Sequence, residues 1–262
     1  MKKYIGIDIG STNAKIAMVD ENENLIKTLV KKTGFSSKDT ANILIKEILD
    51  DKIFDNEEDK NDIKIVATGY GRVSVENATK VVTEITCHAK GATYIFKDDN
   101  IVIIDIGGQD TKIIDVENGV VKDFVMNDKC SAGTGRFLEV MAKTMEISIE
   151  ELCDLARLGS GVTISSLCTV FAESEVISLI GKSEKKENIA NAVLMSIINK
   201  VSAQTKKINL KNKNICLTGG LSEMSFVVES LSKALNANVK SDKNGKFAGA
   251  IGAALMAKNI KE

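Results

Sequence analysis

Hydrophobic and polar residues follow one another in blocks that predict strands and helices in the first third of the chain. The expected strands are residues 4–10, 14–19, 25–30 and 63–69, and the expected helices are 39–49 and 83–94. Ser36 or Ser37 is the expected N-cap of the first helix, because apolar side chains at helical spacing follow it. The charge-rich segment 50–62 is expected to be a solvated loop.

The opening pattern returns in the middle of the chain with an offset of 97 residues. Residues 8–19 and 105–116 agree at six of twelve positions, and in each copy an apolar strand ends in an aspartate followed by a glycine turn. Such self-similarity indicates two related halves. Two such turns facing each other would hold a polyphosphate from both sides, since backbone N–H groups and hydroxyls in tight turns cradle phosphate oxygens.

The second half of the chain is mainly helical. The expected helices are 131–145, 148–158, 168–182, 187–209, 222–235 and 245–258, and a strand at 214–220 closes on Gly219 and Gly220. The small residues of 246–255 suit close packing against a neighbouring element. The whole pattern predicts an α/β protein with mixed sheets flanked by helices. Its first lobe is expected at 1–96, with 245–262 packing back on it, and its second lobe at 97–244.

The composition excludes several classes of protein. A net charge of −1 gives no electrostatic reason to expect a nucleic acid or an anionic membrane as partner. No apolar run approaches the roughly 18–20 residues of a membrane span, and the N-terminus leads straight into a strand instead of a signal peptide. Five cysteines, an odd number, argue against a disulfide framework. We therefore expect a cytoplasmic protein.

Two cysteines stand in similar settings. Cys130 lies in a polar segment rich in glycine and serine, and Cys168 directly precedes an apolar helical run. Both are expected at helix starts, where free N–H groups and the positive end of the helix favour a thiolate or another anion. From the residues alone they are core thiols, redox thiols or half of a metal site. Cys153 and Cys216 are expected in the core, and for Cys87, whose role the sequence leaves open, the core is the favoured place.

Several familiar sites are absent from the sequence. There is no nucleotide-binding motif of the G-x-x-x-x-G-K-[ST] type, no G-x-G-x-x-G after a strand, and no C-x-x-C pair. The chain has one histidine, His88, which supports neither a histidine zinc site nor a Ser-His-Asp triad. His88 is expected to be a structural hydrogen-bonding residue.

Three motifs together resemble the two phosphate loops and the adenosine loop of the actin, sugar-kinase and chaperone-ATPase superfamily. They are residues 8–12, 105–110 and 217–220. More narrowly, three segments resemble the activators of 2-hydroxyacyl-CoA dehydratases and the ATP-driven subunits of benzoyl-CoA reductase: residues 84–89, 127–137 and 168–176. The resemblance covers nearly the full length. It implies a two-lobed, actin-like (ribonuclease H-like, duplicated) ATPase fold.

The resemblance also implies ATP, Mg²⁺ and one [4Fe-4S] cluster shared across a homodimer, with Cys130 and Cys168 of each chain as its ligands. Such a cluster takes four thiolates, which a two-fold axis would supply from two cysteines per chain. The expected nucleotide contacts are Gly10, Ser11, Thr12, Asn13 and Lys15 in the first loop, Gly107 and Gly108 in the second, and Gly219 and Gly220 at the nucleoside. Asp8 and Asp105 are expected to serve Mg²⁺, and Gln109 or Asp105 to orient the attacking water.

The expected function is that of an ATP-dependent one-electron donor. Reduced ferredoxin or flavodoxin would load the cluster, and ATP binding would move the helices that start at Cys130. The electron would pass to a 2-hydroxyacyl-CoA dehydratase or a related double-cluster reductase, and hydrolysis would reset the switch. One alternative is a small-molecule kinase, such as an amino-sugar kinase, although the cysteine helices occupy the region where sugar recognition would be needed. Another is a regulatory ATPase or scaffold without redox chemistry.

Overall fold

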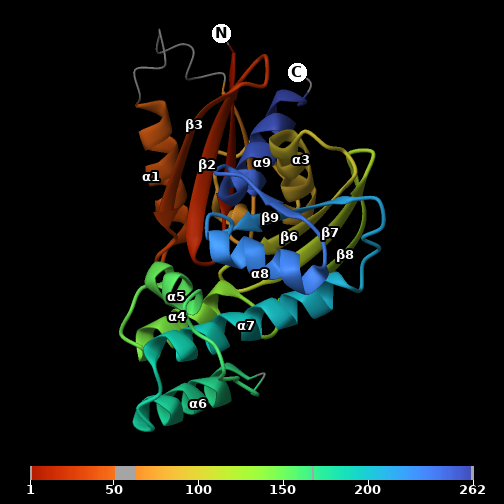
Figure 1. Cartoon of the computed structure of the whole chain (residues 1–262). Helices are drawn as coiled ribbons and strands as arrows, with labels where there is room; N and C mark the ends of the chain where they lie inside the picture. Colours follow the sequence, from red (N-terminus) through yellow and green to blue (C-terminus); the bar gives the residue numbers. More distant parts are fainter. Residues whose placement is uncertain (1, 51–62, 167, 261–262) are drawn as a thin grey trace. The chain divides into compact units, whose positions relative to one another are not determined.

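The computed structural model describes residues 2–50, 63–166 and 168–260 (Figure 1). The loop expected at 50–62 therefore lies outside the described residues, apart from Asp50. The chain forms two compact units, one of Met1–Asn100, Val116–Val121 and Asn244–Glu262 and the other of Ile101–Asp115 and Lys122–Lys243. In the described ranges, no helix is both long enough and apolar enough to span a bilayer.

The first unit is built on a sheet whose described strands lie in the order β3-β2-β1-β4-β5. The strands are β1 (Lys3–Ile9), β2 (Asn13–Asp20), β3 (Leu25–Lys32), β4 (Lys64–Thr68) and β5 (Lys80–Val81). β1, β2 and β3 pair antiparallel, as expected from the polar turns between them, while β4 runs parallel to β1 and β5 parallel to β4. The sheet is therefore mixed.

Helices cover both faces of this sheet. The helix α1 (Ser37–Leu49) packs its apolar stripe on one face, against alternate residues of β1 and β2 such as Ile5, Ile7 and Ile16 (Figure 1). The helix α9 (Ala248–Lys258) covers the other face, where it meets Ala17 and Val19. Ser36 is the N-cap of α1, because its hydroxyl accepts a hydrogen bond from the backbone N–H of Asp39 at 3.1 Å.

Close packing of small residues joins α9 to α3 (Glu84–Phe96). A Cβ atom added to Gly252 would lie 1.8 Å from the carbonyl oxygen of Cys87, and one added to Gly91 would lie 1.8 Å from that of Ala248. Only glycine lets the two helix backbones approach so closely. The close packing expected from the small residues of 246–255 is confirmed.

The second sheet has the strand order β10-β9-β6-β7-β8 among the described residues. Its strands are β6 (Ile101–Ile106), β7 (Thr111–Glu117), β8 (Val120–Asn127), β9 (Asn214–Gly219) and β10 (Val239–Ser241). Read from the other end, this is the order of the first sheet, with β6 in the place of β1 and β9 in the place of β4. The duplication predicted from the opening hairpin thus extends to the whole sheet.

Five helices surround one large apolar core in the described part of the second unit. They are α4 (Gly135–Thr144), α5 (Ile149–Ala156), α6 (Thr169–Gly181), α7 (Lys186–Thr205) and α8 (Ser225–Leu235). Buried side chains of α4, α5 and α7 pack against those of β6 and β9. These helices match the expected ones to within a few residues at most ends.

The start of the helix after Cys130 was predicted wrongly. The segment expected to be helical from residue 131 first makes a turn, and α4 begins at Gly135. The turn forms because Gly133 has a φ of +85°, a left-handed conformation that breaks the helix. Thr134 then donates from both its backbone N–H and its hydroxyl to the carbonyl of Ser131. Cys168, in contrast, is the N-cap of α6, as expected.

Candidate nucleotide and cysteine sites

The first candidate acid, Asp8, is buried near the end of β1, with 5% of its surface exposed. In the sheet register it stands opposite Lys15 on β2 and beside Thr68 on β4. Its Oδ1 atom is buried and has no hydrogen-bond partner among the described residues. A buried carboxylate oxygen of this kind is costly unless something binds it. It is also the oxygen ligand that Mg²⁺ prefers.

Two glycines fit around the Asp8 carboxylate. A Cβ atom added to Gly69, which has a φ of +85°, would lie 2.3 Å from Asp8 Oδ1. A Cβ atom added to Gly249, at the start of α9, would lie 2.5 Å from Asp8 Oδ2. The carboxylate therefore occupies space that any other residue at these positions would fill.

The second candidate acid, Asp105, has the same place in the second sheet and is 3% exposed. Its Oδ1 accepts a hydrogen bond from the Thr218 hydroxyl at 3.1 Å. Its Oδ2 lies 3.5 Å from Nζ of Lys112, which is also 2.8 Å from Oδ1 of Asp110. Gly219, with a φ of +86°, stands beside Asp105 as Gly69 stands beside Asp8.

The two candidate phosphate loops make the same turn. The backbone N–H of Gly10 donates to the carbonyl of Asn13 at 3.2 Å, and that of Gly107 donates to the carbonyl of Asp110 at 2.9 Å. Most polar residues of these loops are solvent-accessible, among them Ser11, Asn13 and Gln109. Their hydroxyl and amide groups are therefore placed where phosphate oxygens can reach them.

The second loop is bound to the start of α4. The backbone N–H groups of Gly135 and Arg136 donate to the carbonyls of Gly107 and Gly108, at 2.9 and 2.7 Å. The Thr111 hydroxyl donates to the carbonyl of Gly133 at 2.6 Å. A displacement of this loop therefore moves the turn that directly follows Cys130.

The five cysteines divide clearly into two groups. None forms a disulfide; Cys130 and Cys168 are exposed, while Cys87, Cys153 and Cys216 are buried, as expected. Burial raises the pKa of the Cys87 thiol to about 12 and that of Cys153 to about 11. The Cys87 and Cys153 thiols are therefore protonated, and all three buried thiols are enclosed by the fold, so only the exposed pair is available to a metal.

One hydrogen bond brings the segments of the two exposed cysteines together. The hydroxyl groups of Ser131 and Thr169, each the residue after a cysteine, lie 2.7 Å apart. The Asn127 side chain donates to the carbonyls of Cys130 and Ala132, both at 2.9 Å, and thereby holds the first of these segments. Two exposed thiols on neighbouring, hydrogen-bonded segments fit half of a four-thiolate site.

A scan with family models places residues 5–257 in the BadF/BadG/BcrA/BcrD ATPase family. The chain belongs to this family. The "(R)-2-hydroxyglutaryl-CoA dehydratase activating ATPase" of Acidaminococcus fermentans is 39% identical over 256 residues, which are 97% of this chain and 96% of that protein. Because the match covers nearly the full length of both chains, it includes almost every helix and strand described above.

Solved structures of the same family share the fold. Component A of (R)-2-hydroxyglutaryl-CoA dehydratase from A. fermentans matches with a TM-score of 0.91 at 37% identity, covering 99% of this chain and 98% of that one. The activator of the 2-hydroxyisocaproyl-CoA dehydratase from Clostridium difficile, solved with bound ADPNP, matches with a TM-score of 0.86 at 36% identity, covering 98% and 94%. The actin-like ATPase fold is confirmed, and the chain is an ATP-binding and ATP-hydrolysing enzyme.

Several residues around the two acids of this ATPase were not predicted from the sequence. Gly69 and Thr68 repeat the Thr-Gly pair that was recognised only at positions 218 and 219, so the repeat itself was the available signal. Lys112 matches Lys15 at the same offset. No local pattern marks Gly249, which reaches Asp8 only through the packing of α9 on the sheet.

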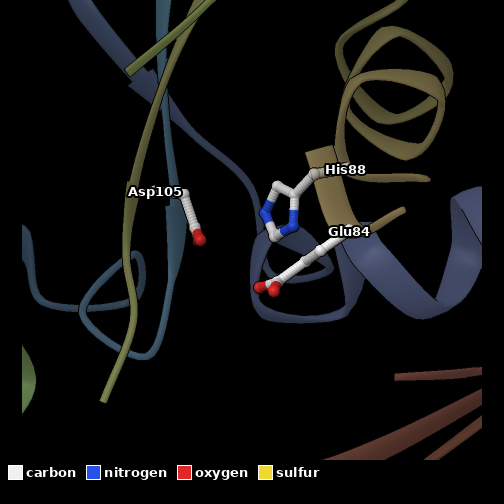
Figure 2. A group of neighbouring side chains, drawn as sticks. All are labelled: Glu84, His88 and Asp105. Carbon is white, nitrogen blue, oxygen red and sulfur yellow. The ribbon is translucent and has the colours of Figure 1, made fainter. Parts of the chain in front are cut away.

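The neighbourhood of His88 in this ATPase is shown in Figure 2. His88 and Glu84 lie one turn apart on α3 and extend from the same face of the helix (Figure 2). His88 is buried, and its Nδ1 lies 3.4 Å from the position that a Cβ atom of Gly249 would occupy. The histidine therefore packs beside the glycine that borders Asp8. Asp105, also drawn, stands near the end of β6 in the second unit.

Proposed function

We propose that this ATPase is an activator that delivers single electrons to a 2-hydroxyacyl-CoA dehydratase or a related double-cluster CoA-ester reductase. The relatives that it matches over nearly their whole length are named as activators of such dehydratases. The observation that carries the proposal in this chain is the exposed pair Cys130 and Cys168, held on neighbouring segments by the bond between Ser131 and Thr169. A sugar kinase or an actin-like scaffold has no use for such a pair.

The pair of thiols is proposed to hold a [4Fe-4S] cluster, which when bound supplies one-electron chemistry at low potential. Cys168 stands at the N-terminus of α6, where the unpaired N–H groups of the first turn stabilise negative charge. Asn127 fixes the carbonyls on both sides of Ser131 and so keeps the Cys130 segment in place. The chain itself thus provides orientation and charge stabilisation for two ligands.

The proposed activator is a homodimer. Four thiolates are needed and one chain offers two, so a two-fold axis through the cluster completes the set. The helix α6 supports this arrangement, because it buries only Ala172 and Val176 and leaves large apolar side chains exposed. These exposed residues are Val170, Phe171, Ile177 and Ile180. A helix that begins at a cluster ligand and presents an apolar face favours contact with a second copy.

ATP is proposed to bind through both loops, with Mg²⁺ at Asp8 and with Gly219 and Gly220 beside the nucleoside. The expected phosphate contacts are those named from the sequence: Gly10, Ser11, Thr12, Asn13, Lys15, Gly107 and Gly108. The hydrogen bonds from Gly135 and Arg136 to the second loop give nucleotide binding a direct route to the Cys130 segment. We expect reduced ferredoxin or flavodoxin in the cytoplasm as the electron source, and hydrolysis as the step that resets the protein.

Iron counting and iron chelation under anaerobic conditions test this proposal. Reconstituted wild-type protein is expected to carry about two irons per chain. Cys130→Ala and Cys168→Ala are expected to lose the iron, while Cys153→Ala, which removes a buried thiol, keeps it. ATP with Mg²⁺ is expected to change the rate at which a water-soluble iron chelator removes the metal.

Two outcomes would remove the proposal. Iron that stays bound in Cys130→Ala would show that these thiols are not ligands. A colourless, air-tolerant monomer that phosphorylates a sugar would favour the kinase alternative.

A further inference from the structure

The duplicated hairpins of the two units carry the same acid and the same lysine, but among other differences they do not share the residue two positions before the lysine. At an offset of 97 residues, Asp8 corresponds to Asp105 and Lys15 to Lys112, whereas Asn13 corresponds to Asp110. One copy thus has one carboxylate for its lysine, and the other copy has two. This difference decides what each lysine is able to bind.

In the second copy the lysine is enclosed by its own carboxylates. Lys112 is 1% exposed, and its Nζ lies 2.8 Å from Asp110 Oδ1 and 3.5 Å from Asp105 Oδ2. A lysine is almost never buried to this extent unless it is paired. A phosphate could reach this ammonium group only by competing with two carboxylates. Lys112 is therefore committed within the protein.

In the first copy neither the Asp8 Oδ1 atom nor the Lys15 ammonium group has a partner among the described side chains. The Asp8 Oδ1 atom is buried without a partner among the residues described. Among the residues that the structure describes, no hydrogen bond or ion pair joins the Lys15 ammonium group to another side chain. Asn13, which is neutral and exposed, adds no negative charge beside it. The lysine is left for an anion and the aspartate oxygen for a cation.

Asp105 and Asp8 differ in the same way as the two lysines, since Asp105 is paired within the described part of the protein and Asp8 Oδ1 is not. Asp105 has a donor on each oxygen, the Thr218 hydroxyl on Oδ1 at 3.1 Å and Lys112 on Oδ2 at 3.5 Å. A carboxylate that already faces an ammonium ion gains less from a divalent cation than one that faces none. Each carboxylate oxygen has more than one lone pair, so Asp105 can also accept a hydrogen bond from water. Asp105 is thus suited to orient a water molecule, and Asp8 to receive Mg²⁺.

We propose that the duplicated hairpins have divided the work of ATP hydrolysis. Lys15 binds phosphate and Asp8 receives Mg²⁺, whereas Lys112 is an internal counter-ion, held by Asp110, that positions Asp105 against the attacking water. This inference rests on the proposed nucleotide role of the two loops and not on electron transfer. It selects Asp105 over Gln109, which the sequence left as equal candidates.

The step that Asp105 assists is an ordinary hydrolysis. The water oxygen bonds to the γ-phosphorus while the bond from that phosphorus to the β–γ bridging oxygen breaks. Asp105 accepts a hydrogen bond from the water, and the water proton ends on the released phosphate. ADP leaves with the bridging oxygen. Lys112 touches neither the water nor the nucleotide in this scheme, so it is a positioning residue.

The matched pair Lys15→Met and Lys112→Met separates the two roles, with ADPNP affinity and the kcat of ATP hydrolysis as the readouts. Lys15→Met is expected to weaken ADPNP binding at least about tenfold, because a charge-assisted contact to phosphate is lost. Lys112→Met is expected to lower kcat about a hundredfold while the ADPNP Kd stays within about threefold, because misplacing a positioned group affects the transition state more than binding.

Two exchange variants test the difference in charge between Asn13 and Asp110. Asn13→Asp gives the first copy the second carboxylate and is expected to weaken ADPNP binding, although Lys15 is still present. Asp110→Asn gives the second copy the neutral amide and is expected to lower kcat at nearly unchanged affinity. Asn13 is exposed and the Asp110 side chain is 28% exposed, so both exchange variants are expected to fold. They keep the test valid if Lys112→Met, which alters a buried side chain, does not fold.

Equal losses of ADPNP affinity in Lys15→Met and Lys112→Met would overturn the inference, since Lys112 would then be a phosphate ligand. An unchanged kcat in Asp110→Asn would overturn it as well. The iron content of each preparation is measured beside the nucleotide assays. A preparation without iron would speak against the electron-transfer proposal and would leave the comparison of the two lysines valid.

Discussion

The substitution Gly249→Ala tests how closely the fold fits the Asp8 carboxylate. The new Cβ atom would lie 2.5 Å from Asp8 Oδ2, and ordinary contacts begin near 3.4 Å, so the carboxylate must move by about 0.9 Å. The backbone of Gly69 borders the other side of the carboxylate, since even a Cβ atom added there would lie only 2.3 Å from Oδ1. A misplacement of roughly 1 Å at a reacting centre costs on the order of a hundredfold in rate. The expected result is a fall in kcat of about that size.

Steady-state ATP hydrolysis at several Mg²⁺ concentrations is the appropriate assay. Because Asp8 is proposed to receive Mg²⁺, Gly249→Ala is also expected to need more Mg²⁺ for half-maximal activity. The helix α9 itself is not weakened, since alanine is about 1 kcal/mol more favourable than glycine within a helix. The effect should therefore appear in activity more strongly than in thermal stability.

Two other glycine substitutions serve as controls. Gly181→Ala adds a Cβ atom that meets nothing within 4 Å and is expected to leave hydrolysis unchanged. Gly252→Ala, one turn further along α9, places its Cβ atom 1.8 Å from the carbonyl of Cys87 and is expected to lower the Tm through the α3–α9 packing. Wild-type kcat and Mg²⁺ requirement in Gly249→Ala would refute the reasoning about Asp8.

Two further predictions concern the cysteines. In the cluster-free native protein, a thiol reagent such as DTNB is expected to modify Cys130 and Cys168 rapidly and the three buried thiols only after denaturation; rapid reaction of a third thiol would contradict the burial found here. Burial raises the pKa of Cys87 from 9.0 to about 12 and that of Cys153 from 9.0 to about 11, so the native state keeps protons that the unfolded state loses above pH 9. The free energy of unfolding is therefore expected to fall as pH rises from 9 towards 11, by up to about 1.4 kcal/mol per pH unit for each thiol, in urea titrations. The Cys87→Ala variant should show a shallower fall, and an equal slope would count against the argument.

The elements that the sequence predicted well are those whose structure depends on the order of polar and apolar residues nearby in the chain. The alternation of apolar residues placed β1 to β4, and the offset repeat at Asp8 and Asp105 indicated a duplicated fold whose two sheets share one strand order. Polar flanks separated Cys130 from the buried thiols, whereas Cys168 was singled out mainly by the family resemblance of its segment. These features depend on neighbouring residues, so the sequence alone carries them.

The features that were missed depend on contacts between distant segments or on one backbone conformation. The left-handed φ of Gly133 delayed the start of α4, and no periodicity reports such an angle in advance. The pairing of Lys112 with Asp105 follows from the sheet geometry, and the role of Gly249 follows from helix packing. The repeat indicated that Lys112 matches Lys15, but only the distances showed that the two lysines are paired differently.

Native mass spectrometry of the anaerobically reconstituted protein can show whether Cys130 and Cys168 of two chains hold one [4Fe-4S] cluster. We expect a dimer whose mass exceeds that of two chains by four irons and four sulfides. The Cys168→Ala variant is expected to lack this added mass. A monomer carrying a complete cluster, or a dimer of the Cys168→Ala variant with the cluster intact, would show that the four thiolates are not these.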